Sequence, residues 1–186
     1  MNRMPYIVST PASRAALHGR RRRGAQRGAS LLEAIAYLGI AAAVVLGAVS
    51  LLNGAFGSAK SNQAAEEVVA LRTAARKLYM GQSYPAEMVP NLLLANAVPA
   101  TIIRGGEGAL NNSWGGAVTV VGAGATFTIS YAAVPQDVCM NLVSGASGWT
   151  SIATGESSSV TTFPATAAQA ATLCGAATNN ITFTAS

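Results

Sequence analysis

An uncharged apolar stretch near the N-terminus restricts the fold of this 186-residue chain more than any other feature. The nineteen residues from Ala34 to Leu52 carry no charge, and as a helix they would be about 28 Å long, close to one bilayer span. A core helix of a small globular domain normally keeps a polar face, and this stretch has only Tyr37 and Ser50 as mildly polar residues. We therefore expect a helix that is covered by lipid or by other copies of itself.

A single acid, Glu33, lies at the start of this stretch. An ionised carboxylate in hydrocarbon costs several kcal/mol, so we expect it to have a function and a partner. Glu33 lies four residues after Ala29, and a cut after Gly28 would give Ala29 a free amine. The ammonium group of Ala29 on a neighbouring copy is the counter-charge that we expect for Glu33.

The residues from Arg27 to Tyr37, behind an Arg-rich leader, resemble the prepilin family. The long leader and a mature first residue other than Phe resemble its type IVb branch. The resemblance implies that a prepilin peptidase cuts between Gly28 and Ala29, that Ala29 becomes N-methylated, and that Glu33 guides assembly. An ordinary secretory signal or signal anchor is the alternative, but such segments rarely contain an acid.

The basic character of the chain belongs to this leader, residues 1–28, which holds seven arginines and no acid. Residues 29–186 have five Lys or Arg and seven Asp or Glu, a net charge of −2. The run Arg20–Arg23 resembles a nuclear-localisation or phosphate-binding tract. Its place before an apolar segment fits better with holding the leader on the cytoplasmic side, and we expect no nucleic-acid binding by the mature chain.

A second, amphipathic helical pattern follows the apolar stretch. Glu66 and Glu67 are expected on its exposed side, with basic residues toward its end, the order that the helix dipole favours. We predict one helix from Ala29 to about Met80, ended by Gly81 and Pro85. The predicted divisions are a leader (1–28), a transmembrane or filament-core helix (29–52), its amphipathic continuation (53–80) and a globular head (81–186). Apolar residues recur at three- and four-residue spacing at Ala64, Ala65, Val68, Leu71, Ala75, Leu78 and Tyr79.

The head is predicted to be α+β, with a small antiparallel sheet whose apolar face packs on the long helix. Phe127, Ile129 and Tyr131 alternate with polar residues and should form that face. The predicted elements are a short helix over Pro85–Val98 broken near Pro90, a turn-rich loop from Arg104 to Asn112, strands Ala117–Val121 and Thr126–Tyr131 joined by a turn at Gly122–Gly124, helices Pro135–Val143 and Ala165–Leu173, and a last strand, Asn180–Thr184.

The only two cysteines, Cys139 and Cys174, are too far apart for a C-x-x-C redox or metal site. In an oxidising envelope they would form one disulfide worth about 4 kcal/mol by the chain-entropy model, and two buried thiols are the alternative. Pilin heads also have a C-terminal disulfide loop. Asn112–Gly116 and Tyr131–Cys139 resemble thin-pilus pilins of conjugative plasmids, and Trp114 is a candidate for either a core aromatic or a receptor contact.

The sequence lacks the residues and motifs that common enzymatic functions need. The only histidine, His18, lies in the leader, so the mature chain has no imidazole for acid–base chemistry or metal ligation. The segment Gly105–Gly108 lacks the spacing of a phosphate-binding loop. Glu66 and Glu67 are adjacent on a helix and point to different sides, so they do not form a catalytic pair. We expect no enzyme activity, no cofactor and no metal.

The resemblance implies a structural subunit of a type IVb pilus used for attachment or conjugative mating. It would start as an inner-membrane precursor in the lipid bilayer and end in an extracellular filament. Its partners would be copies of itself, the prepilin peptidase and the inner-membrane pilus assembly machinery. A minor pilin, a type II secretion pseudopilin and a membrane-anchored surface binding protein that never polymerises are the alternatives.

Overall fold

The computed structural model describes residues 30–155 and 158–186. The chain divides into two compact units, Met1–Val44 and Val45–Ser186. Helix α1 (Leu31–Leu78) begins in the first unit and ends in the second. It ends close to the predicted residue, because Gly81 takes a left-handed conformation (φ +77°) that stops the helix. The predicted cleavage residues, Gly28 and Ala29, lie outside the described residues.

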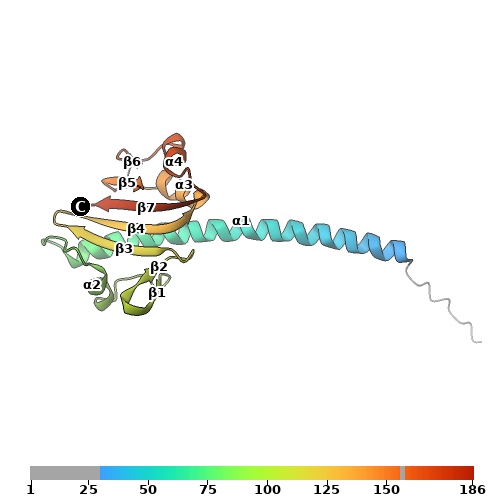
Figure 1. Cartoon of the computed structure of the whole chain (residues 1–186), viewed down its shortest axis with the longest axis horizontal. Coiled ribbons are helices and arrows are strands. Elements are labelled where there is room, and N and C mark those ends of the chain that lie inside the picture. The colour runs from blue at the N-terminus through green and yellow to red at the C-terminus, as the bar shows by residue number, and fades with distance from the viewer. Residues whose placement is uncertain (1–29, 156–157) are drawn as a thin grey trace, which may run out of the picture. The chain divides into compact units, whose positions relative to one another are not determined.

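The second unit contains one seven-stranded antiparallel sheet, and the last part of α1 crosses one face of it (Figure 1). The predicted α+β fold with a long N-terminal helix is confirmed. The strand order is β1-β2-β3-β4-β7-β5-β6, so the C-terminal strand lies in the interior of the sheet. The strands are β1 (Ile103–Arg104), β2 (Leu110–Asn111), β3 (Ala117–Ala123), β4 (Thr126–Pro135), β5 (Ser151–Thr154), β6 (Ser158–Val160) and β7 (Thr178–Ala185).

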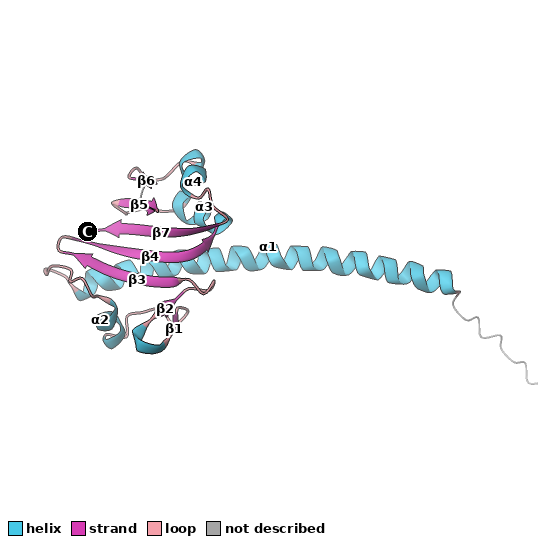
Figure 2. Ribbon diagram, viewed as in Figure 1, coloured by secondary structure: helices cyan, strands magenta, loops and turns pink. Residues whose placement is uncertain are grey.

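Short helices lie at the two edges of the sheet (Figure 2). On the β1 edge lie α2 (Val89–Leu94) and the 3-10 turn η1 (Gly106–Gly108); on the β5–β6 side lie α3 (Gln136–Ser144) and α4 (Ala167–Leu173). The helices predicted at 135–143 and 165–173 are confirmed. The helix predicted over Pro85–Val98 is wrong in extent, since Tyr84 forms a β-bridge with Gly124 and the helix starts only at Val89. Pro90 does not break α2 but lies in its first turn, where no amide hydrogen is needed.

The β3–β4 hairpin is confirmed, but its turn is shorter than predicted. Gly122 and Ala123 belong to β3, and Gly124 (φ +71°) supplies the turn conformation. Gly122 has another reason to be glycine: its amide donates to the carbonyl of Pro85 at 3.0 Å, and a Cβ there would lie 2.3 Å from that oxygen. The chain leaving α1 therefore crosses the hairpin at a point where no side chain fits.

The core forms between α1 and the sheet. Phe127, Ile129 and Tyr131 are fully buried, as their alternation predicted. The predicted apolar stripe is confirmed except at Ala65, which is exposed. Glu67, which was expected on the exposed side, is instead buried with only 3% of its surface accessible. The buried residues of the stripe are Ala64, Val68, Leu71, Ala75 and Tyr79, and Leu78 is half-buried.

Candidate functional site

Glu33 lies in the first turn of α1, where the helix dipole favours a negative charge. Its backbone amide donates to Oγ of Ser30 at 3.2 Å, so Ser30 caps the helix. The hydroxyl of Tyr37, one turn later, donates to Oε1 of Glu33 at 3.4 Å. Both contacts come from neighbours three or four residues away. Only the Tyr37 contact reaches the carboxylate, which therefore remains exposed to a partner.

The helix around Glu33 is apolar on every side. It contains a segment long and apolar enough to cross a membrane, and none of that segment is buried within the chain. Such a surface is stable only in lipid or against other apolar surfaces. The large exposed side chains are Leu31, Leu32, Ile35, Tyr37, Leu38, Ile40, Val44, Val45, Leu46, Val49, Leu51, Leu52 and Phe56.

A buried polar cluster joins α1 to the sheet in the second unit. Nε2 of Gln63 donates to Oε1 of Glu67 at 2.8 Å and to Oγ of Ser113 at 3.0 Å. The hydroxyl of Tyr131 donates to Oε2 of Glu67 at 3.3 Å. Burial, and then the nearby Glu67 carboxylate, raise the pKa of the Tyr131 hydroxyl far above its usual range. Both carboxylate oxygens therefore have a donor, which is the condition for burying a charge at moderate cost.

The segment Asn112–Gly116 forms a tight loop against β4. Oδ1 of Asn112 accepts from the amides of Trp114 (3.0 Å) and Gly116 (2.9 Å), while its Nδ2 donates to the carbonyl of Ala132 at 2.7 Å. A Cβ on Gly116 would lie 1.9 Å from that same carbonyl. Trp114 is half-buried against the core, so it has the core contacts that were one of its two predicted roles.

Arg72 fastens the loop between α3 and β5 to α1. Its Nη1 donates to the carbonyls of Ser147 and Gly148, both at 2.8 Å, and its guanidinium lies 4.5 Å from the ring centroid of Trp149. Burial, and secondarily Arg76, lower the pKa of Arg72. Trp149 in turn packs on Phe183 of β7 at 5.0 Å between centroids.

The disulfide between Cys139 and Cys174 joins α3 to the end of α4. The Cα atoms are 5.8 Å apart and both residues are fully buried. The predicted pairing is present, and the alternative of two buried thiols is wrong. The bond closes the 35-residue loop that contains β5, β6 and α4.

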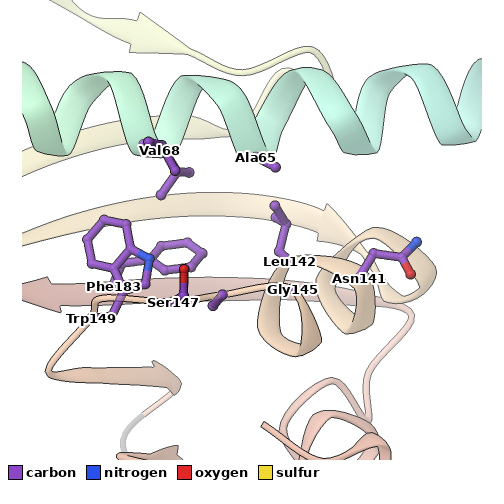
Figure 3. Close-up of a pocket in the computed structure, with 10 residues that line it drawn as sticks. Ala65, Val68, Asn141, Leu142, Gly145, Ser147, Trp149 and Phe183 are labelled. Atoms are coloured by element: carbon purple, nitrogen blue, oxygen red, sulfur yellow. The ribbon is translucent and has the colours of Figure 1, made fainter. Parts of the chain in front are cut away.

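Two hollows flank α1 in the second unit. On one side a cavity of about 100 Å³ lies between α1 and the α3–β5 loop, with Val68, Leu142, Trp149 and Phe183 on its walls (Figure 3). On the other side a groove of about 590 Å³ runs between α1 and the segment after α2; its lining is mostly alanine, with Leu78 and Lys77. Within residues 30–155 and 158–186 no three His, Cys, Asp or Glu side chains come together as a metal site would need.

Sequence reasoning missed the role of Glu67. A signal was available, because Glu67 lies three residues after Ala64 and four before Leu71, which places it on the buried stripe. Arg72 and Gly116 were also missed as structural residues. Their contacts join segments more than fifteen residues apart, and local patterns do not report such contacts.

Comparisons with known proteins agree with this architecture. A family model described as PilS N terminal matches residues 58–186. The crystal structure of a type IV b pilin from Salmonella typhi is similar, with a TM-score of 0.50 and 28% sequence identity over 61% of this chain and 91% of that chain. No curated protein matches the sequence. The matched region holds the sheet and the disulfide loop described above, and the chain therefore belongs to the PilS family and is a type IVb pilin.

Proposed function

We propose that this chain is the precursor of a subunit that polymerises into a type IVb pilus. The leader, residues 1–28, holds the N-terminus in the cytoplasm while the apolar part of α1 lies in the inner membrane. A prepilin peptidase cuts between Gly28 and Ala29, and Ala29 is methylated. Assembly machinery then moves the subunit from lipid into the base of an extracellular filament used for attachment or conjugative mating.

The observation that carries this proposal is the uncovered apolar start of α1 with one carboxylate, Glu33. In a pilin, this surface has two possible environments, which are the lipid of the precursor and the helices of other copies. Transfer of the helix from lipid to the filament exchanges one apolar surrounding for another, so apolar contacts favour neither environment strongly. The charge of Glu33 distinguishes them, because lipid offers it no partner.

Glu33 therefore directs docking in the proposed mechanism. Its carboxylate pairs with the Ala29 ammonium of the preceding copy as the subunit leaves the membrane. The hydroxyl of Tyr37 donates to this carboxylate at 3.4 Å, while Ser30 caps the backbone of the same turn by accepting from the Glu33 amide at 3.2 Å. Burying the two opposite charges as a pair among the apolar helices costs far less than burying either charge alone.

The decisive experiment is intact-mass and N-terminal analysis of protein sheared from the cell surface, with and without reduction. We expect a species that begins at methylated Ala29 and is two hydrogens lighter than its reduced form. A protein found only in membranes with residues before Ala29 still attached would contradict the proposal. It would support the membrane-anchored binding protein instead.

Three substitutions separate cleavage from assembly. Gly28→Asp should leave the leader attached, seen as an unshifted mass. Glu33→Gln should still be cut and remain in the membrane but yield little sheared filament, whereas Glu33→Asp keeps the charge and should retain part of the yield. Normal filament yield from a cleaved Glu33→Gln protein would rule out the pairing role of Glu33.

A further inference from the structure

We infer that the hydroxyl of Tyr37 is a positioning group for docking, because it holds Oε1 of Glu33 and leaves Oε2 as the oxygen that receives the ammonium of the preceding copy. This inference deepens the proposed function and rests on it, since that ammonium is the one that a cut after Gly28 would create. The carboxylate would then have one partner in its own helix and one in the neighbouring subunit.

Tyr37 differs from its neighbours in the uncharged stretch from Ala34 to Leu52. It is the only aromatic residue there, and Ser50 is the only other residue with a polar side chain. A side chain that served only to contact lipid could be Leu, Ile or Val, as at the other large positions of this stretch. The phenol adds a long reach and a hydroxyl donor. That hydroxyl needs an acceptor once the helix lies in hydrocarbon.

The acceptor of this hydroxyl is Glu33, one turn earlier on α1. Residues four apart lie on the same face of a helix, and a long helical side chain leans toward the N-terminus, so Tyr37 extends back over the turn that carries Glu33. Its hydroxyl lies 3.4 Å from Oε1 of the carboxylate. Ser30 contacts the backbone amide of Glu33 instead, at 3.2 Å. Within the described residues, Tyr37 is therefore the one donor to the carboxylate.

The two carboxylate oxygens of Glu33 thereby take different roles. A carboxylate can accept a donor at each oxygen, and the bond from Tyr37 to Oε1 restricts its rotation while Oε2 has no hydrogen-bond partner within the described residues. The backbone below is fixed as well, because the amide of Ala34 donates to the carbonyl of Ser30 at 3.0 Å in the capped first turn. The arriving ammonium meets an oxygen whose place is already set, so less side-chain freedom is lost on pairing.

The same bond has a second consequence while the subunit is still in lipid. An ionised carboxylate without a donor is costly in hydrocarbon, and hydrogen bonds to charged groups are stronger than those between neutral groups. Tyr37 supplies one donor from the same helix, so the charge of Glu33 is partly stabilised before any neighbour arrives. A neutral donor does not replace a counter-charge, and pairing with the ammonium therefore still favours the filament.

Tyr37→Phe tests the inference, because it removes the hydroxyl and keeps the ring. The full-length precursor with this change is produced in cells that assemble the parent into pili. We expect the same cleaved mass and the same amount in the membrane as for the parent, but about tenfold fewer sheared pili, as for the loss of one hydrogen bond to a charged acceptor. Ser50→Ala is the matched control, because it removes the other hydroxyl of the apolar stretch and should leave the yield unchanged.

A second comparison separates this role from that of an interfacial anchor, which tyrosine often has at membrane surfaces. Glu33→Asp shortens the side chain by a methylene, so its carboxylate falls short of the Tyr37 hydroxyl. In that background Tyr37→Phe should change the remaining yield by less than about twofold. An equal loss in both backgrounds, or parental yield from Tyr37→Phe alone, would overturn the inference and leave the proposed function intact. Absence of pili from the parent itself would instead contradict the proposed function.

Nuclear magnetic resonance measures the bond without relying on filament yield. The full-length precursor is placed in lipid nanodiscs with its tyrosines carbon-13-labelled at the ring carbon that bears the hydroxyl, and the Tyr37 signal is identified by its absence from Tyr37→Phe. Glu33→Ala should shift this signal, because it removes the acceptor of the hydroxyl. Leu32→Ala, a change in the same turn, should leave the signal in place. A Tyr37 signal that stays unmoved in Glu33→Ala would also contradict the inference.

Discussion

The hydroxyl of Tyr131 on β4 donates a 3.3 Å hydrogen bond to Oε2 of Glu67 on α1, so a buried polar contact joins the long helix to the middle of the sheet. The other carboxylate oxygen accepts from Gln63, which also reaches Ser113. Apolar contacts alone allow a helix to slide or rotate on a sheet with modest loss. Directional bonds to one carboxylate fix a single position of α1 on the sheet.

Removing the Glu67 carboxylate should destabilise the head. Glu67→Ala leaves the Tyr131 hydroxyl without its acceptor and opens a small void, and we expect a loss of about 2–3 kcal/mol in the free energy of unfolding. Urea denaturation of the mature protein in detergent measures it. Glu66→Gln is the matched control, because Glu66 is the exposed neighbour and should change stability by less than about 0.5 kcal/mol. Equal effects of the two changes would contradict the buried role of Glu67.

The free energy of unfolding should fall at alkaline pH because the pKa of Tyr131 is raised in the folded state. Its pKa is raised in the folded state, so above pH ~10 the unfolded chain releases this proton while the folded chain keeps it. The folded state then binds more protons than the unfolded state, and stability decreases with pH by up to about 1.4 kcal/mol per unit from this group. Unfolding measured from pH 8 to 11 on the parent and on Tyr131→Phe isolates the effect. The difference in the free energy of unfolding between the parent and Tyr131→Phe should shrink as the pH rises. A difference that stays constant would contradict a raised pKa of Tyr131 in the folded state.

The long helix, the central hairpin and the last strand were predictable because their signals are local. An uncharged run, a three- and four-residue stripe and strict alternation at Phe127–Tyr131 each describe one element by itself. Strands β5 (Ser151–Thr154) and β6 (Ser158–Val160) were missed. Each has one buried aliphatic residue among Ser, Thr and Ala, so pairing with β7 and with each other defines them as strands.

The residues of the candidate site were also only partly predictable from local patterns. Glu33 was identifiable because an acid in an apolar run is conspicuous in the sequence. The cavity was not, since its walls come from α1, α3, the following loop and β7, which meet only in the folded chain. The burial of Glu67 was obscured by Glu66 beside it, because an acidic pair in a helix normally indicates a solvated face.

Arg72 should keep the α3–β5 loop ordered. Arg72→Ala removes two bonds to backbone carbonyls and the contact with Trp149, and since the side chain is only partly buried we expect a loss of about 1–2 kcal/mol. Trp149 should become more solvated, seen as a red shift of tryptophan fluorescence. Lys77→Ala, on the exposed side of the same helix, should leave both measurements unchanged. An unshifted spectrum for Arg72→Ala would show that the loop holds without it.

Gly116 should not tolerate a methyl group. In Gly116→Ala the new Cβ would fall 1.9 Å from the Ala132 carbonyl, so the loop or β4 must move and the bonds of Asn112 are strained. We expect a loss of about 3 kcal/mol or more, measured by thermal unfolding. Gly106→Ala is the matched control, because nothing lies within 4 Å of the added atom there. Similar melting temperatures for both variants would contradict the close contact.

The disulfide should stabilise the flank that carries the cavity beside Trp149 more than the rest of the head. Cys139 and Cys174 join α3 to the end of α4, and their loop contains Trp149, whereas α1 and β3 lie outside it. Replacing both cysteines by alanine should cost about 2–4 kcal/mol, up to the chain-entropy value for a loop of this length. Amide hydrogen exchange locates the change, because exchange should quicken first in β5, β6 and α4 and last in the β3–β4 hairpin. Uniform acceleration across the head would show that the bond stabilises the whole fold rather than this flank.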